Sequence, residues 1–161
     1  MWSNATQWPN QTLPEANHNV TIPYQWNLIL DIDPPILKYV EINGILIFDK
    51  TRDYKFQAYY IWVKQGIIQI GNSTNPFTRK ANIILHGAKD DNYLVIDPDA
   101  SGNKMLAVTG GLEFYGIEPQ TAWTKLTETA SINSTQIKVI SAAGWSVGDE
   151  IVIAPSYAGR K

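Results

Sequence analysis

Eight glycines stand where short runs of isoleucine, leucine and valine end. Glycine lacks a Cβ, so inside a strand pattern it marks a bulge, a tight bend or a close approach of two backbones. A fold made of many short strands with sharp corners needs many such positions. The glycines that punctuate the apolar runs in this way are Gly44, Gly66, Gly71, Gly87, Gly110, Gly111, Gly116 and Gly148.

The apolar residues between these glycines recur with a period of two, which is the period of a β-strand. Val40, Ile42, Leu46 and Phe48 share one face of such a pattern. Similar short runs follow, and the last two predicted strands lie around residues 137–139 and 151–153. β-branched residues dominate these runs, and no long amphipathic helix is apparent. The sequence therefore predicts an all-β chain.

Two architectures accommodate many short strands. One is a β-helix-like solenoid, in which successive parallel strands stack and their aliphatic side chains form internal ladders. The alternative is an antiparallel β-sandwich, which needs tight hairpins. The Asn43-Gly44 pair has hairpin chemistry but sits inside an apolar run, where a strand kink fits better. The solenoid is the favoured prediction, with residues 1–161 as a single domain.

Composition and charge limit the classes of partner. The chain has 161 residues, a net charge of −2 and only 17 % charged residues. Its basic residues are scattered along the sequence, so nucleic-acid binding is not expected. No apolar run is long enough to cross a bilayer, and the first residues show no signal peptide. The length suits a single hydrophobic core. We expect the chain to be one piece of a longer extracellular protein.

Asparagine sequons indicate an extracellular or lumenal setting. The pattern Asn-X-Ser/Thr, with X other than proline, occurs more often than chance would produce from this composition. The chain has no cysteine, so disulfides give no information on its compartment. The predicted glycosylation sites are Asn4, Asn10, Asn19, Asn72 and Asn133.

Several motifs together carry a family resemblance that covers almost the whole chain. They include Trp2-Ser3, Ile42-Asn43-Gly44, Asn75-Pro76-Phe77, Ile83-x-Leu85-His86-Gly87 and Trp145-Ser146-Val147-Gly148-Asp149-Glu150-Ile151. In order and spacing they resemble the eight-glycine ("G-eight") domain of fibrocystin, fibrocystin-like proteins and the cell-surface and secreted hyaluronidases.

The resemblance implies an extracellular module of a large membrane-anchored or secreted glycoprotein. In that family the module is followed by parallel β-helix repeats. In the hyaluronidase relatives the chemistry is expected downstream of this chain, so the resemblance transfers no catalytic residue onto it.

A glycosidase needs two carboxyl groups that face each other across a sugar ring. Asp31 and Asp33 would share a face of a strand, but they precede Pro34-Pro35 and are read more simply as a solvated strand end. No catalytic residue is therefore assigned. The alternative, that these acids contribute to a hyaluronan-depolymerising hydrolase, stays open.

One loop has the beginning of a calcium-binding pattern. Asp97, Asp99 and Ser101 supply oxygens at positions one, three and five, and Gly102 follows as the turning residue. The bidentate glutamate expected at position twelve is replaced by Val108. The prediction is therefore a connecting loop with, at most, a weak calcium site, and no other cofactor is expected.

The two histidines show no zinc-binding spacing. His86 directly precedes Gly87 and is predicted to be a hydrogen-bonded residue at a strand end, and His18 stands apart from it. Trp8, Trp123 and Trp145 are expected to plug ends and corners of the fold.

An alternating aromatic run supplies the candidate ligand-binding residues. Tyr59, Ile61 and Val63 are expected on one face of a strand, with Tyr60 and Trp62 on the other. If the second face is outside, these two rings could stack on a sugar.

The function predicted is that of a non-catalytic extracellular module that caps a downstream β-helix of the same chain and binds matrix polysaccharide, such as hyaluronan, or protein ligands. The alternatives are part of a hyaluronan-depolymerising hydrolase and a purely structural interdomain module. No contact with nucleic acid or with a membrane is expected from this stretch.

Overall fold

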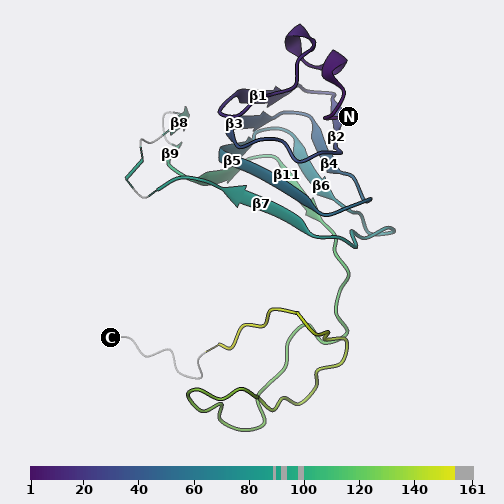
Figure 1. Ribbon diagram of the computed structural model, residues 1–161, viewed down its shortest axis with the longest axis vertical. Coiled ribbons are helices and arrows are strands. Elements are labelled where there is room, and N and C mark those ends of the chain that lie inside the picture. Colours follow the sequence, from purple (N-terminus) through teal and green to yellow (C-terminus); the bar gives the residue numbers. More distant parts are fainter. Residues whose placement is uncertain (89, 92–93, 98–99, 155–161) are drawn as a thin grey trace. The chain divides into compact units, whose positions relative to one another are not determined.

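The computed structural model describes residues 1–88, 90–91, 94–97 and 100–154 (Figure 1). By contact density the chain divides into two compact units, Met1–Ile117 and Glu118–Lys161. The prediction of one domain over residues 1–161 stays a prediction.

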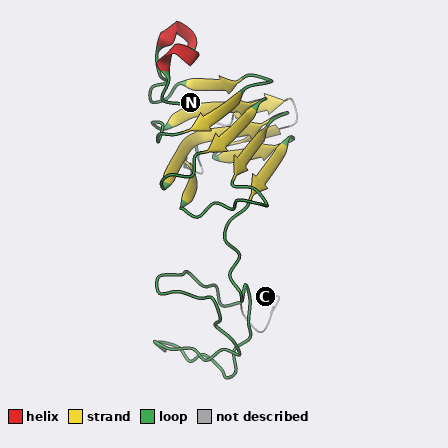
Figure 2. Cartoon of the chain, turned by 90° about the vertical axis from the view of Figure 1, so that its right-hand side faces the viewer, coloured by secondary structure: helices red, strands yellow, loops and turns green. Residues whose placement is uncertain are grey.

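The described chain is mostly β, as predicted, with two short 3₁₀ turns at its start (Figure 2). All the named elements lie in the larger unit. In chain order they are η1 (Ala5–Gln7), η2 (Pro9–Gln11), β1 (Asn19–Ile22), β2 (Asn27–Leu30), β3 (Leu37–Ile42), β4 (Ile45–Phe48), β5 (Tyr54–Val63), β6 (Ile67–Ile70), β7 (Ala81–Leu85), β8 (Leu94–Asp97), β9 (Ala100–Gly102), β10 (Met105–Val108) and β11 (Gly111–Phe114).

The strands form two parallel sheets. Sheet A has the order β1-β3-β5-β10, with β7 also paired to β5, and sheet B has the order β11-β6-β4-β2. Every pairing in these two sheets is parallel, so the antiparallel sandwich is not the fold that forms. Among the named strands of the described residues, β8 and β9 make the one antiparallel pair. Neither sheet closes on itself.

The chain alternates between the sheets. Each of β1, β3, β5 and β10 is followed, after a short corner, by a strand of sheet B. We call such a pair of strands with its corner a rung, and the four rungs are β1–β2, β3–β4, β5–β6 and β10–β11. Because the pairing is parallel and in register, equivalent residues of successive rungs lie on top of one another.

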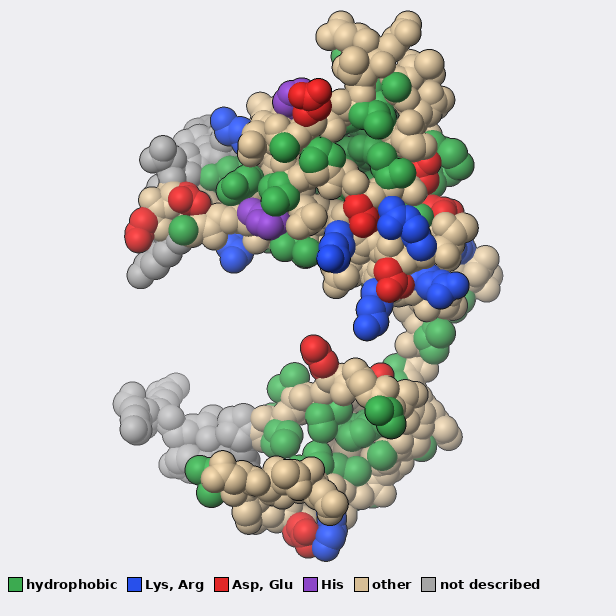
Figure 3. Space-filling model, in the orientation of Figure 1, with side chains coloured by type: hydrophobic (Ala, Val, Ile, Leu, Met, Phe, Trp, Pro, Cys, Tyr) green, Lys and Arg blue, Asp and Glu red, His purple; other side chains and the backbone are tan. Residues whose placement is uncertain are grey.

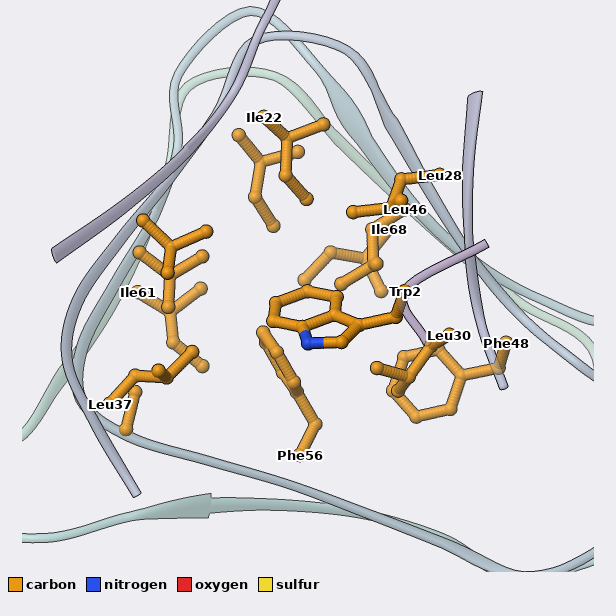
Figure 4. Packing of buried hydrophobic residues seen from close by; sticks show 14 of the residues in the cluster. Trp2, Ile22, Leu28, Leu30, Leu37, Leu46, Phe48, Phe56, Ile61 and Ile68 are labelled. Atoms are coloured by element: carbon orange, nitrogen blue, oxygen red, sulfur yellow. The ribbon is translucent and has the colours of Figure 1, made fainter. Parts of the chain in front are cut away.

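The core consists of aliphatic ladders that run across the rungs. Val20, Val40 and Ile61 form one ladder, Ile22, Ile42 and Val63 a second, and Leu28, Leu46 and Ile68 a third. Their exposed fractions are all 4 % or less. Figure 4 shows side chains of both sheets pointing toward one another. Burial of each aliphatic side chain contributes about 1.5–3 kcal/mol, so the ladders provide most of the driving force for folding.

Two tryptophans cover the first rung. Trp2 and Trp8 are 1 % and 6 % exposed, and their ring centroids lie 4.9 Å apart. The Trp8 Nε1–H donates to the Trp2 carbonyl over 2.8 Å, and the Trp2 N–H donates to the Ile29 carbonyl over 2.7 Å. In Figure 4 the Trp2 ring lies among the core side chains. The prediction that Trp8 plugs an end of the fold is confirmed.

The inward face of β5 changes partway along the strand. Phe56 and Ala58 point inward in its first half, and Ile61 and Val63 do so in its second half. The prediction that Tyr59 lies on the same face of the strand as Ile61 and Val63 was therefore wrong. Residues up to 58 pair with β7 and those from 60 onward pair with β10, and the alternation shifts by one residue between these two segments.

The smaller unit has no named strand among its described residues. The predicted strands there were wrong: Val139 forms one isolated antiparallel bridge with Leu126, and residues 151–153 form no pairing. Val152 is 96 % exposed. A short apolar run becomes a stable strand only where neighbouring strands bury one of its faces, and these runs lack such neighbours within the unit.

Three glycines form a stack at the corners of the rungs. A Cβ on Gly66 would lie 2.0 Å from the Gly44 carbonyl oxygen, and one on Gly110 would lie 2.2 Å from the Gly66 carbonyl oxygen. The same carbonyls accept N–H bonds from Ile67 at 3.0 Å and Gly111 at 2.9 Å. The predicted role of these glycines, a close approach of two backbones at a corner, is confirmed.

We expect the substitution Gly66→Ala to destabilise the protein by about 3 kcal/mol, the upper end of the cost of overpacking, because the clash is with backbone and not with a movable side chain. Urea unfolding measures this. Gly116→Ala is the matched control, since nothing lies within 4 Å of a Cβ there. Equal unfolding midpoints for the two variants would contradict the stacking interpretation.

Candidate functional site

The outward face of sheet A beside the corners carries a connected group of aromatic and charged side chains. Ile61 and Val63 point into the core, so Trp62 and Lys64 lie on the outside. Glu41 of β3 is in register with Trp62. The group that we call the outer network comprises Tyr39, Glu41, Asn43, Trp62, Lys64 and Thr109.

Glu41 is the centre of the outer network. Its Oε2 accepts a hydrogen bond from the Tyr39 hydroxyl over 3.0 Å, and its Oε1 accepts one from Asn43 Nδ2 over 2.9 Å. The Lys64 ammonium lies 3.6 Å from the same Oε1. Only 20 % of the Glu41 side chain is exposed.

These contacts shift two pKa values. Burial by itself would raise the pKa of Glu41, but hydrogen bonds from Asn43 and Tyr39 and the charge of Lys64 outweigh it and lower the pKa. Burial raises the pKa of Tyr39, and the hydrogen bond to the Glu41 carboxylate raises it further. At neutral pH the network therefore holds an anionic glutamate beside a neutral tyrosine.

Trp62 is held in place by two contacts. Its Nε1–H donates to the Thr109 hydroxyl over 3.2 Å, and the Lys64 ammonium lies 4.6 Å from the centre of its ring. Thr109 in turn donates to the Lys64 carbonyl over 2.6 Å. A half-buried indole with a fixed orientation is a surface on which the apolar face of a sugar can stack.

Tyr60 differs from Trp62 in its surroundings. It is 8 % exposed, although it is not part of the central core cluster. Of the two rings predicted to bind ligand, only Trp62 therefore offers appreciable surface. Ligand binding by Tyr60 and Trp62 stays a prediction.

Asp31 and Asp33 hold turns together. Asp31 accepts hydrogen bonds from the backbone and the hydroxyl of Ser3, and these lower its pKa against the raising effect of burial. Asp33 Oδ1 accepts a hydrogen bond from Arg52 Nη2 over 3.3 Å and another from the Lys55 N–H over 3.0 Å. Both carboxylates are thus engaged with the chain itself.

The candidate calcium loop falls partly outside the described residues. Asp97 ends β8 and Ser101 lies in β9, the two strands of the antiparallel pair, and Asp99 is outside the part of the chain that the structure describes. Among the described residues, no three metal-ligating side chains cluster. The calcium site stays a prediction.

The histidines make the local contacts of structural residues. His86 Nε2 lies 3.2 Å from Gln57 Oε1, and its ring centroid is 5.9 Å from that of Tyr59. This confirms the predicted hydrogen-bonded histidine after β7. His18 Nδ1 accepts the Glu15 N–H over 3.2 Å.

The predicted glycosylation sites lie toward solvent. Asn4, Asn10, Asn19 and Asn133 are exposed and Asn72 is half-buried. Asn72 Oδ1 accepts hydrogen bonds from the N–H groups of Thr74 and Asn75, so these bonds do not occupy its amide nitrogen, the atom that a glycan would modify. Glycosylation itself stays a prediction.

The smaller unit has an open depression of about 300 Å³. Trp123 on its rim is 75 % exposed, so the prediction that this residue plugs a corner was wrong. Trp145 is half-buried and its Nε1–H donates to the Thr121 carbonyl over 2.7 Å, and its role at a corner stays a prediction. The lining residues are Thr121, Trp123, Thr124, Lys125, Ile140 and Ser141.

Comparison with known proteins decides the family. The sequence profile described as "G8 domain" matches residues 7–127. The chain belongs to the G8 domain family. It is 37 % identical over 156 residues to fibrocystin-L of Homo sapiens, a match that covers 95 % of this chain and 4 % of that protein.

Other relatives lie in different proteins. Identity is 32 % over 155 residues with fibrocystin of Canis lupus familiaris, covering 94 % of this chain and 4 % of that protein. It is 27 % over 165 residues with protein rliB of Dictyostelium discoideum, covering 96 % and 14 %. No solved structure matches. The G8 chain thus spans a small part of each of these relatives, and the link to hyaluronidases stays a prediction.

The described residues include no helix with the length and apolar character that crossing a bilayer requires.

We expect the pKa of Glu41 to lie below 4.5, its ordinary value. The contribution of this carboxylate to stability is full above that value and is lost as the pH falls through the folded-state pKa. The carboxyl carbon shift of Glu41, followed by NMR during acid titration, measures it. Asn43→Ala removes one hydrogen-bond donor and should move the midpoint upward, whereas Lys138→Ala should not. A midpoint unchanged by Asn43→Ala would contradict this description of the outer network.

Proposed function

We propose that this G8 chain is a non-catalytic extracellular module of a larger cell-surface or secreted glycoprotein. It covers one end of a β-helix formed by further residues of the same protein and presents its outer network to matrix polysaccharide or protein. The observation that carries the proposal is the contrast between the two ends of the ladders.

Within the larger unit, the ladders are covered at the first rung and open at the last. Val108 is 41 % exposed although its in-register neighbour Val63 is fully buried, and Leu112 is 39 % exposed above a fully buried Ile68. Phe114 is 49 % exposed beside Ile70, which is 8 % exposed. The same residue types at equivalent positions are buried wherever another rung follows.

The occupant that fits this end is a further parallel rung of the same protein. Such a rung would continue each ladder in register and pair with the free edges of β10 and β11, which end their sheets. Repetition of this pairing is how parallel solenoids extend. The small share of the fibrocystin relatives that the G8 chain matches is consistent with a module of a longer protein.

A substitution at Phe114 tests the open end. In this chain alone, Phe114→Ser should leave the unfolding free energy within about 0.5 kcal/mol, because the side chain is half exposed. In a longer form of the protein that includes the following rungs it should cost about 3 kcal/mol, because the ring is then buried.

Tyr24→Ser is the control, since Tyr24 is 69 % exposed and lies in the corner of the first rung. It should be neutral in both forms. If Phe114→Ser is also neutral in the longer protein, no rung covers this end and the capping role is wrong.

The outer network supplies the ligand-facing part of the proposal. Trp62 offers a stacking surface, and Glu41, Asn43 and Lys64 offer fixed polar groups beside it. Few flexible side chains must be ordered when a ligand binds, which lowers the entropic cost of binding.

A glycan array, followed by calorimetry with the saccharide that binds best, tests this part. Trp62→Ala should weaken binding up to about tenfold, the size expected for loss of one aromatic stacking contact. Trp26→Ala, at a partly exposed tryptophan in the first corner, should have no effect. Absence of binding at high sugar concentration would leave only the structural role, that of an interdomain module.

A further inference from the structure

Two turns of the larger unit bring together basic residues that lie far apart in the sequence. The Tyr54 N–H donates to the Lys80 carbonyl over 2.8 Å, and the Lys80 N–H donates to Asp53 Oδ1 over 2.9 Å. The Lys50 ammonium donates to the Asn75 carbonyl over 3.1 Å. The turn between β4 and β5 is therefore tied to the segment before β7.

This contact gathers five of the thirteen basic side chains of the sequence. Figure 3 shows Lys and Arg side chains grouped on one side of the larger unit. Lys50 is half-buried and the other four are exposed. We call the group the basic ridge, and its members are Lys50, Arg52, Lys55, Arg79 and Lys80.

The three aspartates near the ridge accept hydrogen bonds from backbone N–H groups or hydroxyls of the same turns. Asp53 accepts the Lys80 N–H, and Asp33 accepts the Lys55 N–H. The Asp49 carboxylate accepts the hydroxyls of Thr51 and Tyr54, and these bonds, that of Thr51 first, lower its pKa against burial. These hydrogen bonds hold the carboxylates at the turns and leave their negative charges in place.

Most of the ridge cations carry no counter-charge. Within the part of the chain that the structure describes, Arg52 is the one member with a carboxylate oxygen within 4 Å, that of Asp33 at 3.3 Å. Arg52 is also held 4.4 Å above the buried Tyr54 ring. Five cations against Asp33, Asp49 and Asp53 leave an excess of two positive charges (5 − 3 = 2) on a chain whose net charge is −2. Binding an anion here therefore breaks few existing ion pairs.

We propose that the basic ridge binds a sulfated polysaccharide. Lys55 lies in β5, and Lys80 directly precedes the neighbouring strand β7. Neighbouring strands lie about 4.8 Å apart, so the ridge presents closely spaced cations to the densely placed anionic groups of such a polymer. Sulfate oxygens accept charge-assisted hydrogen bonds from lysine and arginine. Release of counterions from such a polymer adds to the affinity, as it does for other polyanions.

The surroundings of the ridge favour a sulfated polysaccharide over other polyanions. Single-stranded nucleic acids are bound with exposed aromatic side chains on which bases stack. The aromatic residues of these turns, Tyr54 and Phe77, are 1 % and 5 % exposed and cannot serve in that way. Burial of Phe77 also removes the apolar anchor that a membrane surface would use.

This inference rests on the proposed extracellular setting and deepens it, since it adds a second surface and a charge class for the polysaccharide. It shares no residue with the outer network. Failure at one surface is therefore distinguishable from failure at the other.

The test uses the whole chain, produced without glycans, and heparin as the sulfated probe. The triple variant Lys55→Gln, Arg79→Gln and Lys80→Gln should bind heparin at least tenfold more weakly, and the dependence of its affinity on salt should be shallower. The control triple Lys38→Gln, Lys104→Gln and Lys125→Gln removes the same charge from exposed positions elsewhere and should change affinity less than twofold.

Further measurements identify the class of ligand and check that the variants are folded. Fully desulfated heparin should bind much more weakly than heparin, and Trp62→Ala should leave heparin binding unchanged. If the first triple does not fold, as judged by near-UV circular dichroism, single Arg79→Gln and Lys80→Gln variants replace it.

Three results would overturn the proposal. One is equal loss of heparin binding in the two triple variants. Another is heparin binding that the ridge substitutions leave unchanged. The third is equal or tighter binding of single-stranded DNA or of phosphatidylserine vesicles at the same salt, which would assign the ridge to a different polyanion.

Discussion

The stacking of backbone on backbone at the corners sets the geometry of the whole larger unit. Asn43 and Gly44 both donate to the Ile22 carbonyl, and Lys64 and Gly66 both donate to the Ile42 carbonyl in the next rung. Any side chain at the glycine positions would push the rungs apart. Because the pairing of the flanking strands is parallel and in register, such a displacement would be felt along both sheets, and every aliphatic ladder depends on this contact.

The stack of glycines at the corners also explains why the first and last rungs differ in burial. A ladder held in strict register has an apolar residue at each level, so its last member is as apolar as its interior members. The first level is covered by the two large rings of Trp2 and Trp8, and the Trp2 N–H donates to the Ile29 carbonyl of β2. The described part of the larger unit has no equivalent cover beside Phe114, and the cost of its exposure is what a following rung would remove.

The strand period and the glycine corners could be predicted from the sequence because both depend on local chemistry. The shift of alternation between Tyr59 and Ile61 could not, because it arises where β5 changes its partner from β7 to β10. Strands in the smaller unit were predicted wrongly for a related reason. A period of two shows that a segment can form a strand, and only a neighbouring strand decides whether it does.

The same reasoning applies to the surfaces. Trp62 could be placed on the outside from its alternation with Ile61 and Val63, but its partner Thr109 lies 47 residues further along the chain. Lys55 and Lys80 looked scattered in the sequence because 25 residues separate them, yet the pairing of β5 with β7 brings their segments together. In a parallel stack, side chains from successive rungs converge on the outer faces and at the turns, because the ladders fill the interior. Recognition of a ligand by this G8 chain would therefore depend on residues that neighbouring strands and turns bring together, and such groups can be found in a sequence only after the register of the strands is known.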